Sequence, residues 1–148
     1  MKIGLANDHR AYKVKEELKS LLDEYDIVDY GCFSSEMVDY PKYALTLSNA
    51  VINKEVDLGI VMCGTGIGVS IACNKVKKIR CAKIDNKDEA KSAKEHNNAN
   101  VLAFSAQSHT AKEIKEMVDI FINSTFLSDP RYKMRIEQVE KYEETNEY

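Results

Sequence analysis

The segment Cys63-Gly64-Thr65-Gly66-Ile67-Gly68 places a thiol before three glycines, directly after an apolar run over residues 57–62. Glycine permits positive φ and close backbone approach, and successive amides at a helix start can hold an anion or a developing enolate oxygen. The same position favours the thiolate form of a cysteine, which could take a proton from a carbon acid. The alternatives are a tight turn and an inert buried cysteine. The spacing matches neither a Walker A loop nor a dinucleotide fingerprint.

A second polar segment, Asn7-Asp8-His9-Arg10, follows the apolar residues 2–6. Asp8 and His9 are candidate site residues if this segment lies beside Cys63. The alternative is that Asp8 caps the following helix and His9 is merely exposed.

Two further groups of residues could bind or protonate a substrate. His96 ends a predicted helix, at the sheet edge opposite Cys63, so we expect it either to interact with the helix dipole or to complete the site of a second subunit. Arg131 and Arg135 are four residues apart at a helix start, where two cations oppose each other and the dipole. A phosphate would relieve that conflict; the alternative is a solvated surface pair.

Short apolar runs alternate with helical patterns along the chain, which predicts an α/β, doubly wound (Rossmann-like) five-stranded parallel sheet with helices on both faces and a C-terminal helix. Such a sheet binds ligands at the carboxyl ends of strands 1 and 3, which would bring the two polar segments together. We expect the strand order 2-1-3-4-5. A single domain over residues 1–148 should end in about six frayed residues. The predicted strands are 2–6, 27–30, 57–62, 80–84 and 101–104. The predicted helices are 10–24, one from Asp39-Pro41, one ending near 74, 86–96, one capped by Thr110 and Glu113, and one from Asp129-Pro130.

The chain has 148 residues, 44% of them hydrophobic, and a net charge of −3. This balance argues against nucleic-acid partners, and no apolar run is long enough to cross a membrane. No signal-peptide pattern is present, so we expect a cytoplasmic protein. No Cys-x-x-Cys pair occurs, which argues against a zinc ribbon and thioredoxin-type chemistry. In a reducing compartment the remaining cysteines are expected to be free thiols in the core: Cys32, Cys73 and Cys81.

Taken together, these motifs resemble ribose-5-phosphate isomerase type B, a family that also includes allose- and galactose-6-phosphate isomerases. The resemblance covers residues 2 to about 139. Its motifs are Asp8-His9, Asp39-Tyr40-Pro41, Cys63 to Gly68, Ala72-x-Asn74-Lys75, Glu95-His96-Asn97-x-Ala99-Asn100-Val101 and Arg131 with Arg135.

The resemblance implies reversible conversion of ribose 5-phosphate to ribulose 5-phosphate through an enediol, without metal or organic cofactor. It implies a homodimer, or a dimer of dimers, whose sites are shared between subunits. The catalytic residues that it implies are Cys63 as base, Thr65 beside it, His96 as the ring-opening acid of the neighbouring subunit, and Asp8. The implied substrate-binding residues are His9, Tyr40, Gly64, Gly66, Ile67, Gly68, Asn97, Arg131 and Arg135.

Two departures from the family pattern concern phosphate binding. Arg10-Ala11 stand where the family commonly has Ala-Gly, and Gln107 stands where it often has arginine. Sugar length is therefore open, and a hexose 6-phosphate (allose or galactose) is the alternative substrate. Galactose-specific relatives use two different subunits, one without the cysteine loop, whereas this chain keeps both Cys63 and His96. A non-catalytic module binding small anions or nucleotides is the alternative from another class.

Overall fold

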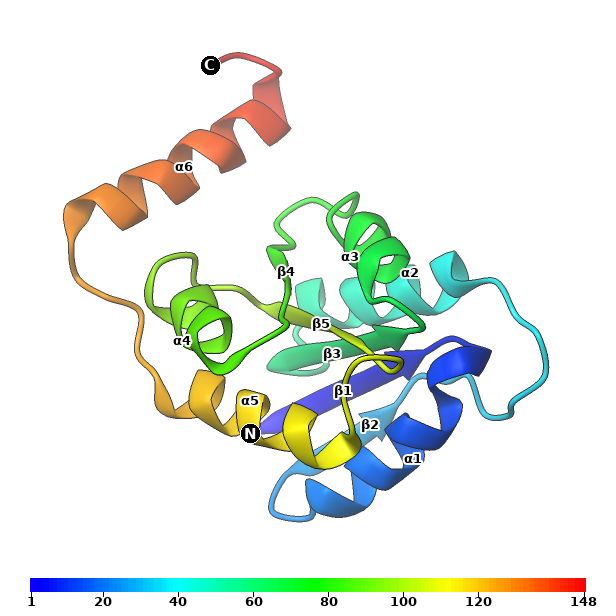
Figure 1. Ribbon diagram of the computed structural model, residues 1–148. Coiled ribbons are helices and arrows are strands. Elements are labelled where there is room, and N and C mark those ends of the chain that lie inside the picture. The colour runs from blue at the N-terminus through cyan, green and yellow to red at the C-terminus, as the bar shows by residue number, and fades with distance from the viewer.

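The computed structural model describes residues 1–148 and contains a five-stranded parallel sheet with helices on both faces (Figure 1). This is the predicted fold class. The strands are β1 Lys2–Asn7, β2 Asp26–Asp29, β3 Leu58–Cys63, β4 Cys81–Lys83 and β5 Val101–Ser105. The helices are the 3-10 turn η1 His9–Ala11, α1 Tyr12–Leu21, α2 Tyr40–Ile52, α3 Ile67–Cys73, α4 Lys87–Glu95, α5 Ala111–Asn123 and α6 Pro130–Thr145.

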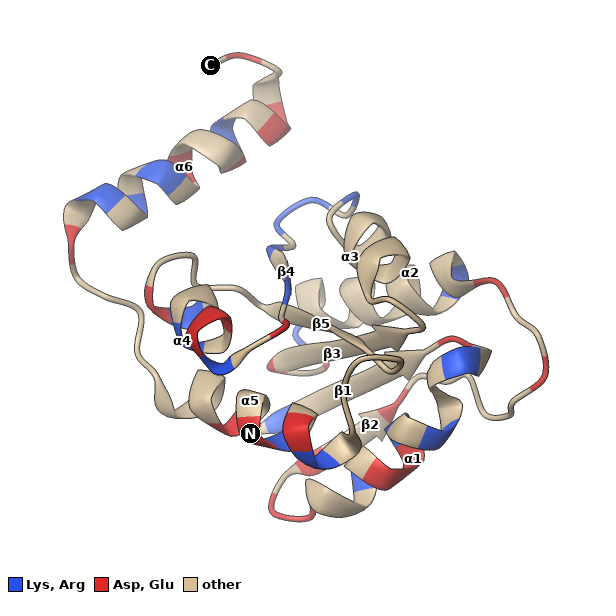
Figure 2. Ribbon diagram, viewed as in Figure 1, with Lys and Arg blue, Asp and Glu red and all other residues tan.

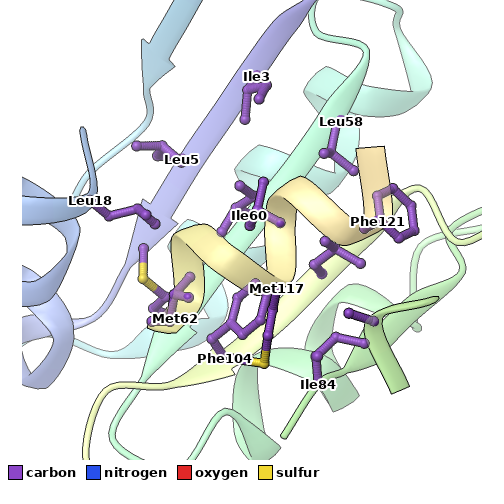
Figure 3. Packing of buried hydrophobic residues seen from close by; sticks show 14 of the residues in the cluster. Ile3, Leu5, Leu18, Leu58, Ile60, Met62, Ile84, Phe104, Met117 and Phe121 are labelled. Carbon is purple, nitrogen blue, oxygen red and sulfur yellow. The ribbon is translucent and has the colours of Figure 1, made fainter. Parts of the chain in front are cut away.

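Side chains that alternate along the strands build one core on each face of the sheet. Leu58, Ile60 and Met62 of β3 join the core under α1, α4 and α5, part of which Figure 3 shows. Val61 and Cys63 point to the other face, into the core under α2 and α3. Cys63 therefore lies on the α2/α3 face, at the last position of its strand.

The strand order is β2-β1-β3-β5-β4, so the predicted order 2-1-3-4-5 is wrong in its last two strands. All five residues of β5 are buried, whereas the three residues of β4 are half-buried. The long apolar strand takes the interior position, and the short strand with Lys83 takes the edge, where burial is less and a charge is tolerated. From β3 the chain crosses through α3 to the edge strand β4, leaving a gap in the sheet. It then returns through α4, on the opposite face, to β5, which fills that gap. Both connections lie on the faces that right-handed crossovers require.

Local capping explains where several helices begin. Thr110 and Glu113 form the predicted capping box of α5. The first helical segment starts with η1, and α1 itself begins at Tyr12 rather than near residue 10. Asp39 occupies the predicted N-cap position of α2, but its side chain accepts no capping hydrogen bond.

The C-terminal helix α6 extends away from the sheet and its covering helices (Figure 1). It buries none of its residues within the chain, and Met134, Val139 and Tyr142 are exposed. None of the helices has the length and apolar content needed to cross a lipid bilayer.

Candidate active site

A pocket of about 350 Å³ opens where β1 and β3 end side by side. Parallel pairing of Asn7 with Met62 brings the residues after each strand together, although they are more than fifty positions apart in sequence. The two polar segments therefore meet, as predicted. The pocket is lined by Asp8, His9, Arg10, Met37, Val38, Asp39, Tyr40, Cys63, Gly64, Thr65 and Gly68.

The thiol of Cys63 lies against the glycine loop. Its Sγ accepts a hydrogen bond from the backbone N–H of Gly66 at 3.1 Å, and the residue is 5% exposed. An N–H directed at sulfur stabilises negative charge on it. The backbone N–H groups of Gly64, Thr65 and Gly68 donate to no other protein group. The loop thus combines a potential base with free amides that can receive an oxyanion.

Glycine is required at two positions of this loop for different reasons. Gly66 has φ of 75°, and a Cβ there would lie 2.9 Å from the carbonyl carbon of Phe104 in β5. Gly68 has the ring of Tyr40 packed over it, 2.8 Å from where a Cβ would stand. The first glycine lets the loop turn against β5, and the second lets Tyr40 close one wall of the pocket.

Ser105, at the end of β5, supports the loop and is a residue that the sequence analysis missed. Its hydroxyl donates to the carbonyl oxygen of Gly64 at 2.8 Å, and it pairs with Cys63 across the sheet. The sequence indicates this residue only by a hydroxyl that directly follows the apolar run over residues 101–104. That signal becomes interpretable once β5 is known to lie beside β3.

Asp8 and His9 line the pocket, but both also have structural partners. The carboxylate of Asp8 accepts hydrogen bonds from the N–H groups of Arg10 and Ala11, at 2.9 and 3.2 Å, so it caps the first helical turn. Nδ1 of His9 lies 3.2 Å from the backbone N and O of Val38. These contacts fix both side chains and tie the β1 end to the segment before α2.

Two other loop residues lie at the edge of the pocket. The hydroxyl of Thr65 accepts a hydrogen bond from the N–H of Ile67 at 3.2 Å, closing the turn into α3. The Ile67 side chain is exposed and lines a separate hollow beside Gln107 and His109. Of these two, the structure brings only Thr65 to the pocket of Cys63.

His96, Asn97 and Arg135 lie in a different hollow of about 550 Å³, between α6 and the α4–β5 connection. The His96 ring stacks on Tyr132, with centroids 4.5 Å apart. Helix α4 runs back to the start of β5, whereas Cys63 is at the carboxyl end of β3. Within one chain these residues are therefore separate from Cys63, as predicted for His96.

Arg131 and Arg135 differ in their surroundings. Arg131 forms an ion pair with Asp129 at 2.6 Å, and its side chain is 70% exposed. Hydrogen bonds from Arg131 lower the pKa of Asp129 to about 2. The charge conflict that suggested an anion near Arg131 is thus already relieved within the chain. Arg135 lines the hollow beside His96.

The remaining cysteines are free thiols. Cys32 and Cys73 are buried, as expected, while Cys81 is half-buried at the edge strand. Cys32 lies close to the end of β1, where Asn7 donates a hydrogen bond to its sulfur. Burial raises the pKa of its thiol, which makes it a poorer candidate for a base than Cys63. No three His, Cys, Asp or Glu side chains are grouped so that they could hold a metal ion.

Comparison with known proteins shows to which family this chain belongs. Residues 3–139 match the family model described as Ribose/Galactose Isomerase. Ribose-5-phosphate isomerase B of Escherichia coli (strain K12) is 36% identical, over 97% of this chain and 97% of that protein. The structure of Clostridium thermocellum ribose-5-phosphate isomerase B has a TM-score of 0.95 and 37% identity, covering 99% of this chain and 100% of that chain. That of the Mycoplasma genitalium ribose-5-phosphate isomerase B, with bound ribulose-5-phosphate, has a TM-score of 0.90 and 34% identity, over 97% of each chain. The chain therefore belongs to the ribose/galactose isomerase family and is a sugar-phosphate isomerase of the aldose–ketose type.

Proposed function

We propose that this enzyme interconverts ribose 5-phosphate and ribulose 5-phosphate, with Cys63 as the base. The observation that carries the proposal is the Sγ of Cys63 beside the Gly66 N–H, in a pocket with three free backbone amides. The names of the relatives support the choice of a pentose phosphate.

The reaction starts from the open-chain aldose. The Cys63 thiolate takes the proton from C2, and the electron pair of that C–H bond forms the C1–C2 double bond of an enediolate. The charge moves to O1, where the free amides of Gly64, Thr65 and Gly68 can stabilise it. The O2 hydroxyl gives up its proton to O1, C2 becomes the carbonyl carbon, and the thiol returns its proton to C1. No atom is gained or lost, and no oxidant is needed.

Ring opening requires a separate acid, and in this proposal it comes from a second subunit. His96 and Asn97 do not line their own chain's pocket, and Arg135 lies with them in the other hollow. A homodimer, or a dimer of dimers, in which these residues and Arg131 face the Cys63 pocket of the neighbour would complete the site. Asp8, His9 and Tyr40 would then hold the sugar from the first subunit's side.

The test is an isomerisation assay on ribose 5-phosphate, allose 6-phosphate and galactose 6-phosphate, run side by side. We expect the highest kcat/KM with the pentose phosphate. Cys63→Ala should still bind the sugar phosphate but lose about 10³-fold or more in kcat, because the proton-transfer group is gone. Cys73→Ala removes a buried thiol outside the pocket and is the matched control. Turnover by Cys63→Ala near that of the control would refute the cysteine base, and preference for a hexose phosphate would refute the substrate.

A further inference from the structure

Arg80 ends the connection between α3 and β4, a segment rich in positive charge (Figure 2). The lysines of this connection are exposed, whereas Arg80 is half-buried: Lys75, Lys77 and Lys78. Nε and Nη2 of Arg80 donate to the carbonyl oxygen of Asn98, at 3.1 and 3.0 Å. Its Nη1 forms an ion pair with Glu140 of α6 at 2.8 Å. One side chain therefore joins the start of β4 to the turn after α4 and to α6.

The Asn98 carbonyl belongs to the turn that carries His96 and Asn97. Asn98 has a φ of 42°, a left-handed conformation that is unfavourable for a residue with a Cβ. Its N–H and its side-chain oxygen are bonded to the carbonyl oxygen and to Nζ of Lys94 in α4, each at 3.1 Å. Its carbonyl oxygen is bonded to Arg80 instead. The turn is thus held by its own helix on one side and by the guanidinium on the other.

The backbone of Arg80 is fixed as well, so the guanidinium acts from a rigid position. The N–H of Arg80 donates to Oδ1 of Asn100 at 2.8 Å, and the N–H of Asn100 donates to the carbonyl oxygen of Arg80 at 3.1 Å. Asn100 directly precedes β5. The sheet edge therefore determines where the Arg80 side chain begins and, through it, where the Asn98 carbonyl lies.

The side chains of His96 and Asn97 have few contacts that could orient them without this turn. The His96 ring stacks on Tyr132, and Nδ2 of Asn97 reaches the carbonyl oxygen of Ser92 only at 3.5 Å. Both residues line the same hollow as Arg80. Their placement consequently depends on the backbone of the turn, which Arg80 holds.

We propose that Arg80 is a positioning residue, which fixes the turn so that His96 can protonate the ring oxygen of the sugar in the neighbouring subunit. The proposal rests on the proposed function for the role of His96. In that step the bond between C1 and the ring oxygen breaks, the ring oxygen takes a proton from His96, and the C1 hydroxyl loses its proton to water and becomes the aldehyde. A displacement of an acid by about 1 Å can lower such a rate up to about 100-fold. Arg80 itself touches no sugar atom in this proposal.

The first test separates ring opening from proton transfer at carbon. Ribulose 5-phosphate carries its phosphate on O5 and cannot close a five-membered ring, so deuterium incorporation from solvent at its C1 reports the Cys63 step without ring opening. We expect Arg80→Gln to lower kcat with ribose 5-phosphate about tenfold, and to lower the exchange rate less than about threefold. Lys77→Gln removes an exposed cation from the same connection and should change neither rate. Equal losses of both rates in Arg80→Gln would overturn the proposal.

A double-mutant cycle tests whether Arg80 acts through His96. In a His96→Ala background, Arg80→Gln should lower the remaining kcat less than about twofold, because the group that it positions is already absent. A further tenfold loss in that background would contradict the assignment. Arg80→Lys keeps the charge but not the planar fork of donors, so its loss should lie between those of the wild type and Arg80→Gln. It provides the same comparison in a variant that disturbs folding less.

An NMR readout separates this inference from the proposed function. The Tyr132 ring shields the ring protons of His96, whose resonances are assigned by their absence in His96→Ala. Arg80→Gln should move them downfield, and Lys77→Gln should not. If the wild type converted no ribose 5-phosphate, the proposed function would fail while these resonances still reported the hold of Arg80 on His96. If they stayed unchanged in Arg80→Gln while the wild type converted ribose 5-phosphate, only the present inference would fail.

Discussion

At the scale of single residues, the pocket depends on backbone groups as much as on side chains. The Gly66 N–H holds the Cys63 sulfur, and the same residue adopts a φ of 75° against the backbone of Phe104. The position of the thiol and the shape of the loop are therefore set by one glycine. Side chains such as Asp8 and Thr65 fix the surrounding turns by accepting backbone hydrogen bonds.

Replacing this glycine should affect both stability and turnover. In Gly66→Ala the left-handed backbone and the 2.9 Å approach to Phe104 are incompatible with a Cβ. We expect the free energy of unfolding to fall by about 2 kcal/mol or more, and kcat to fall because the loop moves away from Cys63. Urea unfolding and an isomerisation assay measure the two effects.

The matched control is Ile71→Ala, on the exposed side of α3. It should change neither quantity appreciably. A Gly66→Ala enzyme with wild-type stability and kcat would show that the loop does not need the left-handed conformation.

At the scale of elements, an ion-pair network around the buried Lys15 joins α1 to the end of β2. Lys15 is fully buried, and its Nζ lies 2.6 Å from Asp29 and 2.9 Å from Glu16. Lys19 reaches the same Asp29 carboxylate at 3.0 Å. Burial raises the pKa of the Asp29 carboxyl, but hydrogen bonds from Lys15, the Gly31 N–H and Lys19 outweigh it and leave the pKa below its usual 3.8. The network fixes the chain where it leaves the sheet toward the segment that lines the pocket.

Lys15→Met should therefore destabilise the protein in a pH-dependent way. At pH 7 we expect the free energy of unfolding to fall by about 2–3 kcal/mol, because the half-buried Asp29 carboxylate loses the buried Lys15 ammonium as its partner. A carboxyl whose pKa is lowered on folding stabilises the fold above its unfolded pKa and loses that contribution as pH falls through its folded pKa. The difference in the free energy of unfolding between the wild type and Lys15→Met should thus become smaller as pH falls below about 4.

Lys19→Met serves as the control for this prediction, since the Lys19 side chain is 37% exposed. Lys19→Met should lower the free energy of unfolding by less than about 1 kcal/mol at pH 7. Denaturant unfolding at several pH values checks both variants. A Lys15→Met effect that stays constant down to pH 3 would contradict the assigned role of Asp29.

At the scale of the whole molecule, the proposed site residues divide into two groups that one chain does not bring together. Cys63 and Asp8 line the pocket at the carboxyl ends of the strands, whereas His96 and Arg135 line the hollow beside α6. Helix α6 buries no residue of its own within the chain. In a symmetric dimer, the pocket with Cys63 in one subunit would face the hollow with His96 in the other, and the same pairing would occur a second time.

Mixing two inactive variants tests this arrangement directly. In a hybrid dimer of Cys63→Ala and His96→Ala chains, one site lacks both groups and the other has both. Random exchange should then restore up to about one quarter of wild-type activity, because half of the dimers are hybrids with one intact site. The assay is turnover after refolding the mixture together.

The control is a mixture of Cys63→Ala with Cys63→Ser chains, which has no intact site and should stay inactive. Absence of recovery in the first mixture, with hybrid dimers demonstrated by mass, would exclude sites shared between subunits.

The sequence by itself determined the fold class and the place of the pocket. Apolar runs alternating with helical patterns require a parallel sheet, and such a sheet brings the segments after β1 and β3 together. The capping box of α5 was likewise readable, because Thr110 and Glu113 interact only locally.

Only the tertiary structure decided the position of β5 between β3 and β4, and with it the support of the Gly64 carbonyl by Ser105. It also decided that Arg10 and Gln107 lie close to Gly64. Strand order and side-chain convergence depend on contacts between segments far apart in the chain. Local periodicity does not encode such contacts, which are set by the packing that buries the most apolar strand at the centre of the sheet.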